Sequence, residues 1–158
     1  MKNRLPMLLV LLCLLVGCGA HGEEVLQVTP SPEAVVTVET DAFAEYLASV
    51  EARSEAIKKS LSEDALTQHD MNMKSEELYI LWDDALNDLW GELKKAMPEG
   101  EFAALTEEQL AWIEEKEAAV REAGGEFEGG SIYPLIVNGE ASRITEERVY
   151  ELYDLLKE

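Results

Sequence analysis

The spacing of the apolar residues constrains the fold of this chain more than any other feature. From Asp41 to the C-terminus these residues recur every three or four positions, which places them on one face of an α-helix. We find no convincing strand alternation, internal repeat or heptad run in the sequence. The pattern therefore predicts an all-α domain over residues 41–158, a small bundle of four to five helices.

Helix-capping residues and helix breakers divide the first half of this domain. We expect a helix over residues 41–61 and a second one from about Thr67 to Met97, because Pro98 and Gly100 follow and stop it. The pattern leaves open whether the helix over 41–61 packs on the core or forms a separate stalk.

The second half of the domain carries its own start and stop signals. Thr106-Glu107-Glu108-Gln109 has the pattern of a capping box and is expected to open a third helix, which Gly124-Gly125 closes. A last helical segment follows Ser131. Asn138-Gly139 would divide that segment in two if the chain turned there, and the apolar spacing leaves both outcomes open.

The N-terminal residues have the pattern of an export signal. Lys2 and Arg4 precede an apolar run over residues 5–16, which is too short to span a bilayer and fits a signal-peptide core. The run ends in Leu15-Val16-Gly17-Cys18, which resembles the lipobox of bacterial lipoproteins. That resemblance implies a signal peptide at residues 1–17 and a diacylglycerol, with fatty acids such as palmitate, on the Cys18 thiol. An ordinary secretory signal with an incidental cysteine is the alternative.

The residues that follow are expected to form a tether. Residues 18–40 are interpreted as the lipidated cysteine and a flexible linker, because Gly19, Gly22, Pro30 and Pro32 interrupt a stretch without a helical stripe. The expected location is the extracytoplasmic face of the cell membrane, with the lipid as the only membrane contact.

The charge and the scarce cysteine and histidine residues exclude several classes of function. The chain has 33 Asp and Glu against 13 Lys and Arg, a formal net charge of −20, which leaves no basic footprint for a nucleic acid or an anionic membrane. It has only 2 Cys and 2 His, too few for a disulfide framework or a typical zinc site. Without a recognisable nucleophile, base or phosphate loop, we predict no enzyme, no cofactor, no metal and no small-molecule substrate.

An ordered series of short motifs resembles the lysozyme inhibitor LprI-like N-terminal domain family over about residues 66–156. The matching residues are Thr67-Gln68, Met71-Asn72, Asp83, Leu86-Asn87, Trp90, Leu93, Gln109, Ala111-Trp112-Ile113, Lys116-Glu117, Gly129-Gly130-Ser131, Thr145 and Arg148. The resemblance implies a small helical secreted or lipoprotein-borne domain that binds and inhibits lysozyme. Lysozymes of the animal type are basic, which suits an acidic chain.

The chain also departs from that family. Members commonly carry cysteines near the positions held here by Lys74, Val120 and Glu140, and Trp90 replaces the usual tyrosine. Disulfide stapling is therefore absent, and stability must come from the core or from the helix over 41–61.

The motif residues are interpreted mainly as structural. This applies to Asp83, Asn87, Trp90, Gln109, Trp112, Gly130, Ser131, Thr145 and Arg148. Two functional alternatives stay open. Trp112 could be a binding anchor, and Asp83 with Asn87 could be a polar recognition pair rather than a structural contact, for example with Arg148.

The acidic excess suggests where a basic partner would bind. Residues 99–131 contain 10 acidic and 2 basic residues, and their glycine-rich end holds Glu126, Phe127 and Glu128. A flexible acidic loop with one apolar tip fits an enzyme cleft, so we expect these three residues to contact lysozyme. The alternative from another class is an envelope structural or assembly module that binds a protein without inhibiting lysozyme.

Overall fold

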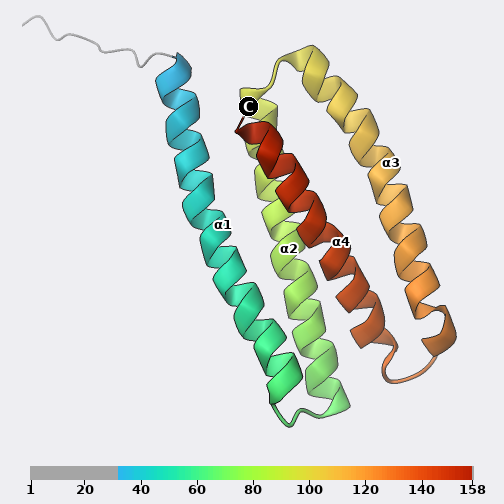
Figure 1. Ribbon diagram of the computed structural model, residues 1–158. Helices are drawn as coiled ribbons and strands as arrows, with labels where there is room; N and C mark the ends of the chain where they lie inside the picture. Colours follow the sequence, from blue (N-terminus) through green and yellow to red (C-terminus); the bar gives the residue numbers. More distant parts are fainter. Residues whose placement is uncertain (1–31, 158) are drawn as a thin grey trace, which may run out of the picture.

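The computed structural model describes residues 32–157, with side chains from Ala42 onward. The predicted signal peptide at 1–17, the predicted lipid site at Cys18 and the linker up to residue 31 lie outside the described residues. The all-α prediction is confirmed, and the described part of the chain holds four α-helices and one short 3₁₀ turn (Figure 1). These elements are α1 (Pro32–Glu63), α2 (Gln68–Ala96), α3 (Glu99–Gly124), η1 (Gly125–Phe127) and α4 (Tyr133–Leu156).

The helices form a bundle around one central pair. α2 and α4 pack against each other along most of their length, whereas α1 and α3 lie on opposite sides of that pair (Figure 1). α3 packs mainly on α4 and contacts the backbone of α2 only sparsely. Among residues 32–157, no helix has both the length and the hydropathy that a transmembrane span requires.

The core lies between α1, α2 and α4. Its fully buried large side chains include Trp82, Leu89 and Leu93 from α2 and Val149 and Leu152 from α4. The indole Nε1 of Trp82 donates a 3.1 Å hydrogen bond to Ser54 Oγ of α1, so this buried polar group is satisfied. α1 adds four buried apolar side chains, which are Phe43, Leu47, Val50 and Ile57. The helix over 41–61 is therefore part of the core and not a separate stalk.

Helix α1 begins earlier than the sequence pattern predicts. It starts at Pro32, so residues 32–40 are helical and their assignment to the flexible linker is corrected. Proline is well tolerated in the first turn of a helix, because its missing N–H would be unpaired there. Residues 33–63 contain neither glycine nor proline, so nothing in the chain interrupts the helix once it has begun.

Helix α2 matches its predicted ends closely. Thr67 is its N-cap: Thr67 Oγ1 accepts from the Asp70 N–H (3.2 Å), and the Thr67 N–H donates to Asp70 Oδ2 (3.3 Å). The hydrogen bond that Thr67 Oγ1 donates to Asp70 Oδ2 (2.6 Å), followed by the one from the Thr67 N–H, lowers the pKa of the Asp70 carboxyl. The helix ends before Pro98, as expected.

The capping box predicted at Thr106 is wrong. α3 begins immediately after Pro98, and Thr106 lies inside it, where its Oγ1 donates to the Phe102 carbonyl (2.7 Å). Phe102 also packs against Trp90, with ring centroids 5.0 Å apart. Glu101 and residues 103–105 favour a helix, and Phe102 packs on Trp90 of α2. The helix therefore forms despite Gly100 and continues through Thr106.

The second half of the domain forms two long helices, and the last one is not divided. α3 ends at Gly124, as predicted, and α4 runs without a break through Asn138-Gly139. A Cβ at position 124 would lie 2.6 Å from Val137 Cγ1 and 2.8 Å from Tyr133 Cε2. Only glycine therefore lets the end of α3 approach α4 this closely.

Candidate functional site

A surface cleft between α2 and α3 is lined by eight of the motif residues. α3 leans on α4, so its middle stands away from α2 and leaves a hollow of about 210 Å³. We call this hollow the motif cleft. It is lined by Asp83, Leu86, Asn87 and Trp90 of α2 and by Gln109, Trp112, Ile113 and Lys116 of α3. Residues spread over more than thirty positions of sequence thus share one site.

Lys116 lies at the edge of the cleft, where its ammonium group is surrounded by one carboxylate and two aromatic rings. Its side chain is only 13% exposed, and its Nζ lies 3.9 Å from Asp83 Oδ1. The same Nζ lies 5.0 Å from the centroid of the Trp112 ring and 5.6 Å from that of Tyr79. The two aromatic faces and one carboxylate together compensate the charge of a largely buried ammonium.

Asp83 and Asn87 form a polar pair on the α2 wall of the cleft. Asn87 Nδ2 donates to the Asp83 carbonyl (2.8 Å) and to Asp83 Oδ2 (3.3 Å). The Tyr79 hydroxyl donates to Asp83 Oδ1 (3.4 Å). Burial, followed by the Asp83 carboxylate, raises the pKa of Tyr79. The pair makes a structural contact across to α3, but its cationic partner is Lys116 and not Arg148.

Arg148 ties α4 to α3 behind the cleft. Its side chain is 7% exposed, and its Nη2 and Nη1 donate to Glu108 (2.8 Å) and Glu151 (3.0 Å). Its Nε donates to Gln109 Oε1 (2.9 Å), and its Cζ lies 5.7 Å from the centroid of Trp112. Trp112 is half-buried between the two cations and packs against the core. Its main contacts are therefore internal.

Thr145 lies one helical turn before Arg148 and is fully buried. Its hydroxyl has no hydrogen-bond partner among the described residues. An unpaired buried hydroxyl lowers stability, because it has lost its hydrogen bonds to water without replacing them.

Two further motifs hold the turn that follows α3. Gln68 Nε2 donates to Asn72 Oδ1 (2.9 Å), and Asn72 Nδ2 donates to the Ser131 carbonyl (2.9 Å). The Gly130 N–H donates to the Phe127 carbonyl (2.9 Å) after Gly129, whose φ is +75°. Gly129 has a left-handed backbone conformation, and Gly130 lies close to the Phe127 carbonyl. These two constraints explain why the motif has two glycines.

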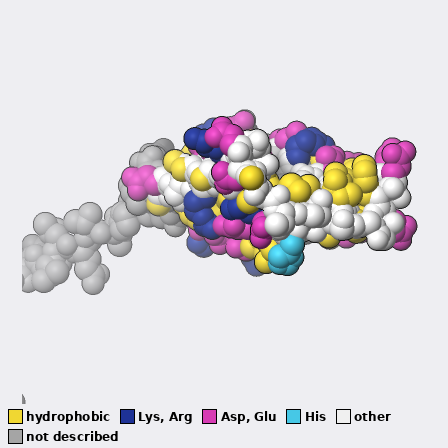
Figure 2. Space-filling model, turned by 90° about the horizontal axis from the view of Figure 1, so that it is seen from below, with side chains coloured by type: hydrophobic (Ala, Val, Ile, Leu, Met, Phe, Trp, Pro, Cys, Tyr) yellow, Lys and Arg dark blue, Asp and Glu magenta, His cyan; other side chains and the backbone are white. Residues whose placement is uncertain are grey.

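The three residues predicted to contact lysozyme lie on that turn, outside the motif cleft. Glu126, Phe127 and Glu128 are all exposed, and the Phe127 side chain is 37% exposed. The segment is a 3₁₀ turn held by hydrogen bonds, and not an open flexible loop. Figure 2 looks onto this end of the molecule and shows hydrophobic side chains beside acidic ones at the edge farthest from the grey segment.

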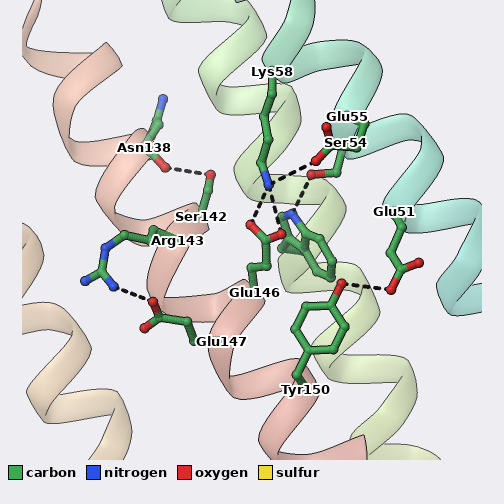
Figure 3. Close-up of polar contacts among 11 residues, drawn as sticks. Glu51, Ser54, Glu55, Lys58, Asn138, Ser142, Arg143, Glu146, Glu147 and Tyr150 are labelled. Carbon is green, nitrogen blue, oxygen red and sulfur yellow. Dashed lines mark hydrogen bonds and ion pairs between the residues drawn. The ribbon is translucent and has the colours of Figure 1, made fainter.

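A polar seam joins α1 to α4 on the other side of the bundle. Lys58 Nζ contacts both carboxylate oxygens of Glu146 at 2.8 Å, and the Tyr150 hydroxyl donates to Glu51 (2.8 Å). Figure 3 shows these side chains pointing toward one another from the two helices. The sequence analysis missed this seam because its partners lie almost a hundred residues apart, and no local pattern links them.

No group of three His, Cys, Asp or Glu side chains within residues 32–157 is arranged to hold a metal ion. The acidic and basic side chains of the motif cleft are instead engaged with each other.

The fold and the cleft define a small helical bundle whose motif residues connect α2, α3 and α4. The chain belongs to the lysozyme inhibitor LprI family, whose model matches residues 59–152. It is also similar to an uncharacterized protein of Rhizobium meliloti (strain 1021), with 29% identity over 106 residues that cover 59% of this chain and 76% of that protein. No solved structure matches the chain. The family resemblance read from the motifs is confirmed.

Proposed function

We propose that this protein binds and inhibits a basic lysozyme by protein–protein contact, while a lipid on Cys18 holds it at the extracytoplasmic face of the cell membrane. Membership of the lysozyme inhibitor LprI family carries the proposal, because the match spans α2, α3 and most of α4. The protein acts as a binding module and not as an enzyme. Its buried charged side chains, such as Lys116 and Arg148, serve internal contacts.

The turn with Glu126, Phe127 and Glu128 is the proposed contact with lysozyme. It presents one apolar ring between two exposed carboxylates. The hydrogen bonds at Asn72 and Gly130 order it before binding, which reduces the entropy lost on association. Two carboxylates attract a basic enzyme, and an apolar tip gives the contact an anchor that salt does not screen.

The experiment is a cell-wall-clearing assay with an animal-type lysozyme. The chain from residue 18 onward, with Cys18→Ser to omit the lipid, is titrated at low and at physiological salt. We expect stoichiometric inhibition at both salt concentrations. The double variant Glu126→Lys/Glu128→Lys is expected to inhibit lysozyme about tenfold less strongly. Glu114→Lys/Glu115→Lys is the matched control on α3, because it changes the net charge equally at two exposed positions.

The outcomes separate the proposals. If both double variants lose inhibition equally, the two proteins pair only through their net charge. That result would reject the turn as the contact with lysozyme. No inhibition at either salt would reject lysozyme as the partner and would favour a structural or assembly module of the envelope. For the anchor, the full chain is expected to incorporate radiolabelled palmitate, whereas Cys18→Ser is expected to incorporate none. Equal incorporation in both proteins would reject lipidation at Cys18.

A further inference from the structure

A second surface, unrelated to the motif residues, runs along the outside of α1 and α2. Two adjoining hollows of about 400 and 360 Å³ meet at Tyr46, and together we call them the outer groove. The larger hollow is lined by Tyr46 and Arg53 of α1 and by Met73, Glu77, Ile80 and Asp84 of α2, among others. α1 lies largely outside the family match at residues 59–152, so the groove is not a feature of the matched segment alone.

The groove exposes two large apolar side chains. Met73 is 53% exposed and Ile80 is 49% exposed. They lie two helical turns apart on the same face of α2, one above the other. Neither belongs to the hydrophobic core, although both border the groove wall next to the buried Leu81. Two aligned apolar side chains in a concave surface provide the anchor points that a partner helix needs.

The charges around these anchors are mostly negative. Glu76, Glu77 and Asp84 line the larger hollow with Arg53 as its only base, and Asp88 and Glu92 line the smaller one with Lys95. Burial, together with Asp88, raises the pKa of Tyr46 to about 12, so its hydroxyl stays neutral at physiological pH. A partner with cationic side chains beside its apolar ones is therefore complementary to the groove.

The shape favours a helical partner. The hollows extend from Met73 to Lys95 along α2, about 33 Å at a rise of 1.5 Å per residue. α1 and α2 lie side by side along this length (Figure 1), and the valley between two neighbouring helices accepts the ridge of a third.

Charge argues against three other occupants. A second copy of the chain, at a net charge of −20, would bring like charges together in the groove. Residues 19–31 carry Glu23 and Glu24 but neither Lys nor Arg, so they are not complementary to it. An anionic membrane surface is repelled for the same reason.

We propose that the outer groove binds a cationic amphipathic helix, whose aliphatic stripe covers Met73 and Ile80 while its Lys or Arg side chains face Glu77 and Asp84. This surface is distinct from the turn at 126–128, and the proposal holds or fails independently of lysozyme inhibition.

The test measures binding of a synthetic peptide by fluorescence anisotropy. The probe is an 18-residue amphipathic helix of Leu and Lys with a fluorescein label, and the same peptide with Glu in place of Lys is its control. The protein is the chain from residue 18 with Cys18→Ser, which retains every described residue. We expect Met73→Ser/Ile80→Ser to weaken binding about tenfold. The matched control is Leu110→Ser/Leu155→Ser, at two exposed leucines outside the groove, and it is expected to change binding less than twofold.

A second pair of variants tests the charges. Glu77→Gln/Asp84→Asn is expected to weaken binding severalfold and to reduce its salt dependence, whereas Glu114→Gln/Glu115→Gln on α3 leaves both nearly unchanged. All four positions are at the surface or partly exposed, so the fold is retained and circular dichroism verifies it. The proposal is overturned if the wild type does not bind the Lys peptide. It is also overturned if the groove and control variants lose affinity equally, because the peptide then senses only the net charge.

Discussion

The two outer helices are held to the α2–α4 pair by different kinds of contact. α1 buries Phe43, Leu47, Val50 and Ile57 against the pair. α3 is longer than a typical globular helix, yet it buries only Leu105 among its large apolar side chains. Its other anchors are polar, and they centre on Arg148 and Lys116.

We infer from this difference that α1 offsets the stability that disulfides would otherwise provide. The resemblance to the family implies disulfides that this sequence lacks, and α1, mostly outside the matched segment, adds apolar burial instead. Apolar burial stabilises a domain in proportion to its area, whereas a buried ion pair adds little net stability, because the desolvation of its charges offsets their attraction. We therefore expect α1 to dominate global stability and α3 to open more readily.

The largest expected effect is on the α1 side. Leu47→Ala removes most of a side chain that is 4% exposed, and should lower the free energy of unfolding by about 3 kcal/mol. Urea denaturation followed by circular dichroism measures it. Leu110→Ala, at an exposed leucine of α3, is the control and should change stability by less than about 0.5 kcal/mol. Similar losses in both variants would contradict the proposed role of α1.

The second effect concerns the polar anchor of α3. Arg148→Met should lower the free energy of unfolding by about 2 kcal/mol, because Gln109 loses its buried partner. Hydrogen exchange of amides in residues 105–120 should accelerate more than exchange in α1, since α3 loosens locally. Arg121→Met, which breaks only an exposed ion pair with Glu117, should leave both measurements nearly unchanged. Uniform acceleration along the whole chain would argue against separate opening of α3.

A smaller effect of opposite sign is expected at Thr145. Thr145→Val keeps the shape of the side chain and removes a buried hydroxyl without a partner, which should raise stability by about 1 kcal/mol. Thr145→Ser retains the hydroxyl and loses a methyl group, and should destabilise. A thermal melt of the three proteins compares them directly. Destabilisation by valine would show that the hydroxyl contributes a favourable interaction.

The smallest effect is a dependence on alkaline pH at the α1–α2 contact. The pKa of Tyr46 is raised from 10.0 to about 12, so the folded state retains a proton that the unfolded state has lost. The corresponding stability is fully present below pH 10 and is lost as the pH rises toward 12. Tyr46→Phe should flatten this decline in urea midpoints measured between pH 8 and 11. An identical slope in both proteins would mean that other groups cause the decline.

Local signals predicted the helix ends wherever nothing nearby competed with them. Thr67, Pro98 and Gly124 end or begin helices as expected. Thr67 caps α2 through its side chain and Pro98 lacks the N–H that would continue the helix, whereas Gly124 also lets α3 approach α4. Thr106 failed as a cap because Phe102 and Leu105 found packing partners and kept the preceding turns helical. The start of α1 was missed because Pro32 was interpreted as part of a linker, although it also fits a first helical turn.

The sequence also predicted the candidate sites only in part. The motifs named all eight residues that line the cleft, but not how they pair: Asp83 faces Lys116, and Arg148 binds Gln109. The sequence analysis did not predict the outer groove. Met73 and Ile80 lie outside the buried stripe of α2, but only the position of α1 beside α2 shows that they border a concave surface.

The sequence by itself determined that the described domain is helical, that it lacks internal disulfides and that it belongs to its family. Periodicity, residue counts and ordered motifs are properties of the chain alone. The tertiary structure decided which helices share a core, which charges pair and which apolar side chains stay exposed. These outcomes depend on contacts between distant segments, and the free energy of such contacts is set by burial and geometry that no local pattern encodes.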